Sequence, residues 1–203
     1  MIVLIHRAQK FNVDIGDEFG VELDVRDTQG APHLAHDPIK DEDSVRLIDW
    51  VRTFPNYAMY ALNVKSDGNE RVITNIMNSI VGEDRWFVFD MSYPCRMNYA
   101  AWGRNIVDRY SDLEEDVSPY SMNCGIWSDR WKWDKRKNNY LMVSRVKVPH
   151  YYVSPELHLG SDVKKWRIDD QSYLHSHWQM VKDDSRFAGI CTDFYEEAKE
   201  FFK

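Results

Sequence analysis

Short apolar runs alternate with longer amphipathic stretches along the whole chain, and this alternation constrains the fold more than any other feature. Apolar runs bounded by turn residues predict strands, whereas apolar residues repeated every three or four positions predict helices. The predicted strands cover residues 2–7, 21–26, 59–65, 86–92, 106–111, 125–129, 151–154 and 189–192. The helical patterns cover residues 43–53, 70–81, 96–103, 133–142, 172–182 and 195–202, and Ser111-Asp-Leu-Glu114 has the pattern of a helix N-cap. Strands that alternate with helices predict an α/β fold with a parallel sheet, and this number of strands favours a (β/α)8 TIM barrel over an open doubly wound sheet.

No stretch rich in Pro, Gly or Ser divides the chain, so we expect one barrel domain over residues 1–203. That length lies near the lower limit of about 200 residues for barrels of this class. Only residues 8–20 separate the first two predicted strands, which is too short for a crossover helix with its two loops. The first βα unit is therefore predicted to be shortened.

The charge balance excludes several classes of protein. With 26 Lys and Arg against 33 Asp and Glu, the formal net charge is −7, which is not typical of proteins that bind nucleic acids or anionic membranes. No apolar run approaches the roughly 18 residues of a membrane span, and His6 and Arg7 directly follow the apolar start, so we expect neither a membrane segment nor a signal peptide. Three widely spaced cysteines, Cys95, Cys124 and Cys191, favour a reduced, cytoplasmic protein. A few local cations or a metal ion must hold any anionic substrate.

Polar residues gather at the carboxyl ends of the predicted strands, on the alternating positions that a barrel would turn toward its lumen. Strands buried on both faces should be almost wholly apolar, so these residues need a cause. In barrel enzymes the carboxyl-terminal mouth of the lumen carries the catalytic residues. The positions are His6, Glu22, Asp24, Arg26, Asn63, Lys65, Asp90, Ser92, Arg109, Ser111, Trp127, Asp129, Tyr152, Ser154, Glu156, Cys191 and Asp193. We expect one site at this mouth, although solvent-exposed strand ends explain the pattern of the later strands equally well.

Four residue pairs follow one another along the chain: His6-Arg7, Glu22-x-Asp24, His36-Asp37 and Asn63-x-Lys65. This series resembles the glycerophosphodiester phosphodiesterase and phosphatidylinositol-specific phospholipase C superfamily, whose barrels carry an HR, an ExD, an HD and an acidic-x-Lys pair in this order. Residues 20–26, 62–65, 110–112, 126–129 and 189–193 are also similar to strand signatures of that superfamily. The resemblance therefore covers nearly the whole chain.

Two features depart from the usual pattern of the superfamily. Residues 8–20 replace a longer segment with a full helix, and Asn63 stands where an acidic residue is expected. Together with Val153-Ser-Pro-Glu-Leu157, these features resemble a compact bacterial branch that is associated with surface-polysaccharide genes. An insertion that covers the substrate in many relatives is also missing after Asp37, so we expect a more open mouth.

The resemblance implies a phosphodiesterase that uses one divalent cation. Glu22 and Asp24, two positions apart on one strand, can present oxygens to a hard cation, and Asn63 from the neighbouring strand can add a carbonyl oxygen. This set suits Mg2+ or Ca2+, and the carboxylate missing at Asn63 predicts weaker or more Ca2+-like binding. Arg7 and Lys65 are the expected phosphate-binding residues.

His6 and His36 are the expected general acid and base, because an imidazole with a pKa near about 6.5 exists in both forms near neutrality. In the mechanism that the resemblance implies, one histidine deprotonates a glycerol 2-hydroxyl, which attacks phosphorus, while the other protonates the leaving alkoxide. Water then opens the cyclic phosphate. Which histidine starts as the base stays open, and Asp37 either orients His36 or forms a turn before Pro38.

Trp127 and Glu156 are the expected lining of the substrate pocket, with barrel packing as the alternative role of Trp127. Two other functions stay open: a catalytically weakened barrel that binds a phosphorylated sugar or a partner, and a phospholipase-like lyase that stops at the cyclic phosphate. The retained histidine pair argues against a pure binding protein. We therefore predict a small phosphodiester substrate, such as a glycerol phosphate group of a surface polysaccharide, and no nucleic-acid partner, whereas the sequence does not indicate an oligomeric state.

Overall fold

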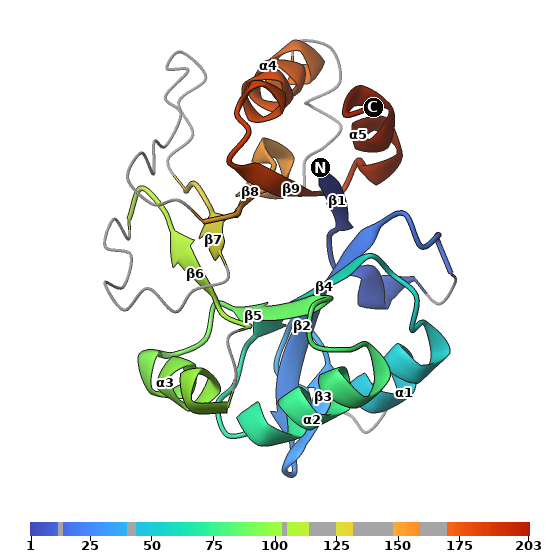
Figure 1. Cartoon of the computed structure of the whole chain (residues 1–203), viewed down its shortest axis with the longest axis vertical. Helices are drawn as coiled ribbons and strands as arrows, with labels where there is room; N and C mark the ends of the chain where they lie inside the picture. The colour runs from blue at the N-terminus through green and yellow to red at the C-terminus, as the bar shows by residue number, and fades with distance from the viewer. Residues whose placement is uncertain (12–13, 40–43, 103–104, 114–124, 132–147, 159–169) are drawn as a thin grey trace.

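The strands form one sheet that curls into a barrel. The computed structural model of the protein describes residues 1–11, 14–39, 44–102, 105–113, 125–131, 148–158 and 170–203. Its strands are β1 (Ile2–Ile5), β2 (Gly20–Thr28), β3 (Ala31–Leu34), β4 (Met59–Val64), β5 (Trp86–Phe89), β6 (Val107–Tyr110), β7 (Gly125–Ser128), β8 (His150–Val153) and β9 (Phe187–Thr192). All except β3 pair in parallel, in the order β5-β4-β2-β1-β9-β8-β7-β6. The two ends of this row meet where the Val88 amide donates to the Asn105 carbonyl (2.8 Å), so the ring is nearly closed (Figure 1).

The ring is apolar on both of its faces, because successive side chains of a strand point to opposite sides. Phe87, Trp127 and Tyr151 belong to a buried cluster that contains no helical residue and fills the lumen. Leu23 and Ile190 belong to the second cluster, which also contains residues of the helices. The middle of the lumen is therefore a packed core, and a substrate can bind only at its ends.

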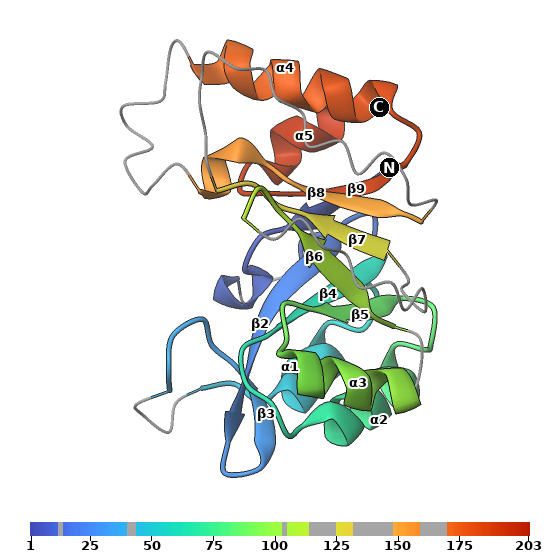
Figure 2. The same ribbon diagram turned by 90° about the vertical axis from the view of Figure 1, so that its left-hand side faces the viewer.

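The helices lie outside the ring. They are α1 (Leu47–Thr53), α2 (Glu70–Ile80), α3 (Tyr93–Trp102), α4 (Asp170–Asp183) and α5 (Tyr195–Phe201), with the short 3-10 turns η1 (Ala8–Lys10) and η2 (Pro155–Leu157). Figures 1 and 2 show α1, α2 and α3 on the side of β2, β4 and β5, and α4 and α5 on the side of β8, β9 and β1. Within the described ranges, no helix has the length and apolar character needed to cross a membrane.

This architecture confirms the predicted parallel α/β barrel with a shortened first unit, since η1 is the one helical turn described between β1 and β2. The helix predicted over residues 133–142 lies outside the described residues. Most of the segment that would follow the predicted N-cap at Ser111 also lies outside them.

A hairpin between β2 and β3 is an addition that the sequence did not predict. Gln29 and Gly30 connect the two strands with φ angles of 52° and 82°. Two consecutive positive φ angles in a two-residue loop are typical of a type I′ turn. The hairpin returns the chain beside β2, where the Ala35 amide donates to the Asp24 carbonyl (3.0 Å). His36 therefore reaches the mouth from an antiparallel return strand, and not from a strand of the barrel.

Candidate active site

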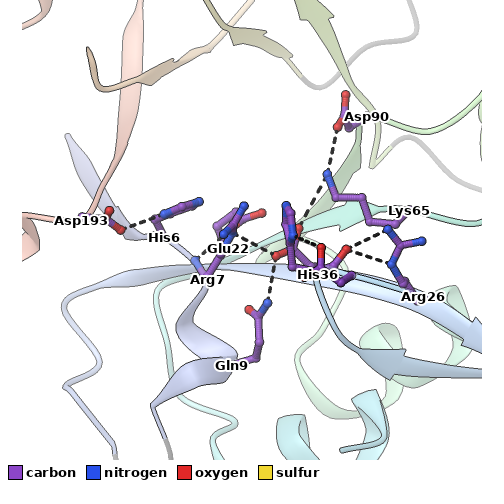
Figure 3. A network of polar contacts seen from close by, with 11 residues as sticks. His6, Arg7, Gln9, Glu22, Arg26, His36, Lys65, Asp90 and Asp193 are labelled. Carbon is purple, nitrogen blue, oxygen red and sulfur yellow. Dashed lines mark hydrogen bonds and ion pairs between the residues drawn. The ribbon is translucent and has the colours of Figure 1, made fainter. Parts of the chain in front are cut away.

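A cavity of about 250 Å³ lies at the carboxyl-terminal end of the lumen. The structure brings together there eight of the nine residues that the sequence predicts for the site. They are His6, Arg7, Glu22, Asp24, His36, Asn63, Lys65 and Trp127. Figure 3 shows polar contacts in this group, with Asp193 beside His6 and Lys65 pointing toward Asp90.

A larger cavity, of about 550 Å³, lies at the opposite end of the ring, beside Met59, Trp86 and Asn105 at the amino ends of β4, β5 and β6. Its described lining includes Glu83 and Asp84 but no Lys, Arg or His. An anionic substrate would meet uncompensated negative charge there. The smaller cavity, with its cations and histidines, is therefore the candidate active site.

Glu22 and Asp24 form a buried pair of carboxylates on β2. They are 2% and 1% exposed. The Arg7 amide donates to Glu22 Oε2 (2.8 Å), and Gln9 Nε2 donates to Asp24 Oδ2 (3.0 Å). Burial and then the negative charge of Asp24 raise the pKa of Glu22, although the hydrogen bond from Arg7 opposes this change. A cation between the two carboxylates would relieve their repulsion.

Asn63 adds a third oxygen beside this pair. The register of β2 and β4 places Asn63 opposite Asp24. Its Oδ1 atom is buried and accepts no hydrogen bond from any described residue. Among the described residues no three Asp, Glu, His or Cys side chains are arranged to hold a metal, so the candidate set consists of two carboxylates and one amide. A buried carbonyl oxygen without a partner beside two carboxylates fits a hard divalent cation such as Mg2+ or Ca2+.

Three cationic side chains surround the carboxylates of the cavity. Arg7 Nε lies 3.5 Å from Asp24 Oδ2, and Lys65 Nζ lies 3.7 Å from Asp24 Oδ1. Lys65 Nζ also lies 3.3 Å from Asp90 Oδ2, and Arg109 pairs with the other oxygen of Asp90. All three cations line the cavity, where charge-assisted hydrogen bonds to phosphate oxygens would be strong.

Each of the two predicted catalytic histidines has a carboxylate at Nδ1. His6 Nδ1 lies 2.8 Å from Asp193 Oδ1, and His36 Nδ1 lies 2.9 Å from Asp37 Oδ1. Arg26 donates two hydrogen bonds to the backbone carbonyl of His36, at 2.9 and 2.8 Å, and so fixes the chain at this residue. A carboxylate that accepts the Nδ1 proton leaves Nε2 to exchange a proton with a substrate. The contact between Asp37 and His36 favours the orienting role of Asp37.

The sequence places Asp193 at the end of a predicted strand but does not predict its contact with His6, which the structure shows. The two residues are 187 positions apart, but β1 and β9 are neighbours and pair from Ile2 to Ile5. Burial acts to raise the pKa of Asp193, but the hydrogen bond and positive charge of His6, with Lys10 and Arg7, lower the pKa below its ordinary value. Asp193 therefore faces His6 as a carboxylate.

The wall from β7 and β8 contains residues that the sequence did not select. Asp129 Oδ1 lies 2.5 Å from His158 Nε2, and the ring of Trp131 packs on His158 with centroids 4.3 Å apart. All three residues line the cavity. Trp127 stacks on Phe89 with centroids 4.0 Å apart, so it both lines the cavity and packs in the lumen. Asp129 was among the polar strand-end positions but not among the nine predicted site residues, whereas His158 follows η2, where no strand pattern applies.

The predicted alternation of β5 and β8 is wrong. Phe87 and Phe89 of β5, and Tyr151 and Val153 of β8, face the lumen, one position away from the predicted residues. Asp90 still lines the cavity, because its φ angle of 66° interrupts the strand geometry after Phe89. The lumen of these two strands is therefore more apolar than predicted.

Glu156, predicted for the substrate pocket, does not line the cavity. Because Val153 faces the lumen, the next residue, Ser154, faces the outer layer, and Glu156 follows in η2. Glu156 Oε2 accepts a hydrogen bond from Ser154 Oγ (2.5 Å). Its Oε1 atom accepts from Thr192 Oγ1 and from the Asp193 amide (3.2 Å). Both carboxylate oxygens of Glu156 are therefore occupied by hydrogen bonds within the fold and do not face a substrate.

The comparisons with known proteins concern the fold. No protein-family model and no curated protein matches the sequence. One similar solved structure is a glycerophosphodiester phosphodiesterase from Agrobacterium tumefaciens str. C58, with 14% identity and a TM-score of 0.61 over 98% of this chain and 100% of that chain. Another is a glycerophosphodiester phosphodiesterase from Parabacteroides distasonis, with 11% identity and a TM-score of 0.58 over 99% of this chain and 96% of that chain. The chain therefore has the fold of the glycerophosphodiester phosphodiesterases.

Proposed function

We propose that this chain is a metal-dependent phosphodiesterase that hydrolyses a glycerophosphodiester-like substrate, with His6 and His36 as general acid and base. The observation that carries the proposal is one cavity that contains both histidines, each with a carboxylate at Nδ1, and the buried pair of Glu22 and Asp24. The fold that the chain shares with glycerophosphodiester phosphodiesterases supports the substrate class.

A divalent cation, Mg2+ or Ca2+, is the proposed cofactor. Glu22, Asp24 and Asn63 would hold it, and the buried Asn63 oxygen without a hydrogen bond supports this assignment. When bound, the cation supplies Lewis-acid polarisation of the phosphoryl group. Arg7 lines the cavity, with its Nε 3.5 Å from Asp24 Oδ2, and is the first proposed phosphate-binding residue. Lys65 is the second proposed phosphate-binding residue.

The histidines move the protons of the proposed reaction. One histidine accepts the proton of a glycerol 2-hydroxyl at Nε2 while that oxygen attacks phosphorus, and the other donates a proton to the alkoxide whose bond to phosphorus breaks. Asp193 and Asp37 hold the rings by accepting the Nδ1 protons and stabilise the imidazolium forms. A water molecule then opens the cyclic phosphate with the two roles reversed.

The finer proposal is a glycerol phosphate group of a surface polysaccharide or its precursor, processed in the cytoplasm. Trp131, 45% exposed and packed on His158, presents an aromatic surface at the cavity on which a sugar ring can stack. The thiols of Cys95 and Cys191 are free and buried, in keeping with a reducing compartment.

The experiment is an assay of glycerophosphoglycerol with Mg2+, Ca2+ or Mn2+, and with EDTA. We expect metal-dependent release of glycerol phosphate, and a loss of at least about 10²-fold in kcat for His6→Ala and for His36→Ala. His175→Ala is the matched control, because His175 lies on α4, contacts Glu197 and does not line the cavity. A wild-type protein that hydrolyses no phosphodiester with any of the three metals would contradict the proposal.

Phosphorus NMR of the products separates the hydrolase from its alternative. A hydrolase yields a phosphate monoester, whereas a lyase accumulates the cyclic phosphate. A protein that binds a phosphorylated sugar without turnover would support the catalytically weakened barrel.

A further inference from the structure

The Glu156 carboxyl group lies outside the cavity, in a partly buried network between the ends of β8 and β9. Ser154 and Thr192 are both fully buried and both donate hydrogen bonds to it. The Asp193 amide donates a third, to Oε1 at 3.2 Å. Burial raises the pKa of Glu156, and the hydrogen bonds from Ser154 and Thr192 oppose this change.

Each of the two hydroxyl oxygens accepts a hydrogen bond from another donor, so each hydroxyl proton can be donated to Glu156. Trp178 Nε1 on α4 donates to Ser154 Oγ (2.9 Å), so the single hydroxyl proton of Ser154 is left for Glu156. The Phe194 amide donates to Thr192 Oγ1 (3.0 Å), which leaves the Thr192 proton for Glu156 in the same way. Glu156 therefore meets three donors, a role that a carboxylate can fill and an apolar side chain cannot.

The same segment of β9 holds His6. The His6 amide donates to the Thr192 carbonyl (3.2 Å), and His6 Nδ1 contacts Asp193 Oδ1 (2.8 Å). Glu156 binds the side chain of Thr192 and the backbone of Asp193, the two residues that contact His6. Hydrogen bonds thus link Trp178, Ser154 and Glu156 to the backbone of Asp193, and the side chain of Asp193 contacts the His6 ring.

The two catalytic histidines differ in their need for such support. The partner of His36 is the adjacent residue, Asp37, and the chain itself keeps the two close. The partner of His6 comes from another strand, and the Asp193 side chain is 54% exposed, so water competes for its carboxylate. Without an anchor for its backbone, Asp193 would lose orientation relative to His6.

We propose that Glu156 is a positioning residue for His6, which it orients by fixing the Thr192-Asp193 segment. This inference rests on the proposed function of His6. Glu156 touches neither the cavity nor the reacting atoms, so its removal should affect the chemical step and leave substrate binding nearly unchanged. A misplacement of a catalytic group by about 1 Å can cost on the order of 10²-fold in rate.

The test is a double-mutant cycle of Glu156→Ala and His6→Ala, assayed with glycerophosphoglycerol and Mg2+. We expect Glu156→Ala alone to lower kcat by about 10- to 100-fold with KM changed less than about twofold, and to have no further effect in the His6→Ala background. An equal loss in both backgrounds would show that Glu156 does not act through His6. Glu70→Ala is the control for the loss of a buried glutamate, since Glu70 pairs with the Gly68 amide and Asn98 and does not line the cavity.

A second readout does not depend on turnover. The nitrogen-15 NMR shifts of His6 should report the Nδ1-protonated tautomer in the wild type and a mixture of tautomers in Glu156→Ala. Glu156→Gln keeps an acceptor for Thr192 and Asp193 and should therefore retain the Nδ1-protonated tautomer of His6. If Glu156→Ala does not fold, Thr192→Val, which removes one donor to Glu156, should produce the mixture of tautomers in its place. If the wild type is inactive but Glu156→Ala still changes the His6 tautomer, the proposed function is rejected and the contact between Glu156 and the His6 site is supported. If the His6 shifts are the same in Glu156→Ala and in the wild type, the positioning role is rejected.

Discussion

Arg7 and Asp90 line the cavity with backbone φ angles of 50° and 66°, values that non-glycine residues rarely adopt. Each such residue costs on the order of 1–3 kcal/mol unless its surroundings hold it in place. The Arg7 amide is held by Glu22 Oε2, and the Asp90 carboxylate lies between Lys65 and Arg109. The strain is thus stored at the residues that place charge in the cavity, as expected of a site built for an anionic ligand.

Asn63 gives a prediction about the cation. Asn63→Asp should tighten the binding of Mg2+ or Ca2+ by about tenfold, because a third carboxylate adds charge to the ligand set. Asn63→Leu should weaken binding, because it removes the oxygen. Calorimetric titration of the protein with the metal alone measures both effects, and equal affinities in all three proteins would exclude Asn63 from the cation site.

The β2–β3 hairpin is the element that brings His36, a proposed catalytic residue, to the carboxylate pair. Glu22 and Asp24 lie on the part of β2 that pairs with β4, whereas Val25 to Thr28 pair with β3. His36 follows β3, and Arg26 of β2 holds its backbone carbonyl. One hairpin therefore sets the position of His36 relative to the candidate cation site.

The turn of this hairpin can be tested separately from the cavity. Gly30→Val should lower the free energy of unfolding by about 1–2 kcal/mol, because a β-branched residue is strained at the φ angle of 82°. It should also lower kcat by about tenfold, since the return strand positions His36. Gly82 follows α2, has a φ angle of 91° and, like Gly30, has open space where a side chain would lie. Gly82→Val should therefore lower the free energy of unfolding by a similar amount and leave kcat unchanged. Urea unfolding and steady-state kinetics of both variants provide the comparison, and an unaltered kcat in Gly30→Val would contradict the role of the hairpin.

The sequence predicted all eight parallel strands of the described ring, because their apolar runs are long enough to recognise. β3 escaped prediction because Ala31-Pro-His-Leu34 is short and contains Pro32, although Gln29-Gly30 was a detectable turn signal. The pairs with His6, Glu22 and Asn63 were recognisable from their order, and the structure gathers them. The place of Glu156 was not predictable, because it depends on which face of β8 turns toward the lumen, and tertiary packing decides this.

At the scale of the molecule, the net charge of −7 does not describe the cavity. Its described lining has three cationic side chains against four carboxylates, so the cavity carries one carboxylate in excess when the histidines are neutral. The residues are Arg7, Lys65, Arg109, Glu22, Asp24, Asp90 and Asp129. A divalent cation would reverse this sign and attract an anionic phosphodiester. The metal should therefore affect substrate binding as well as the chemical step.

A buried histidine predicts a pH dependence of the free energy of unfolding. His177 on α4 is fully buried and shares a 2.8 Å hydrogen bond with the Tyr152 hydroxyl, and burial, with the charge of Arg130, lowers the pKa of His177 to about 4. Because this pKa is depressed from 6.5, the contribution to stability is present above pH 6.5 and is lost as the pH falls toward 4. Between pH 7 and pH 5 the loss should be about 2 kcal/mol.

The matched variants separate His177 from other titrating groups. His177→Gln should lose less stability than the wild type between pH 7 and pH 5, whereas His175→Gln, a change at a partly exposed position of the same helix, should behave as the wild type. Urea unfolding at the two pH values measures the difference. The same loss in His177→Gln and in the wild type would show that the pH dependence arises elsewhere.

The pairing between neighbouring strands is weaker at the seam between β5 and β6 than between β2 and β4. A single bridge, at Val88 and Ile106, joins these strands in the described part of the ring, whereas β2 and β4 pair from Gly20 to Val25. Local opening should therefore begin at the seam, and the Val88 amide should exchange its hydrogen for deuterium faster than the paired amides of β4. Equal protection would contradict this expectation. In the strand order the seam lies opposite β1 and β9, which lead into His6 and Asp193, so local opening at the seam would move Asp90 and Arg109 while the strands that carry His6 and Asp193 stay paired.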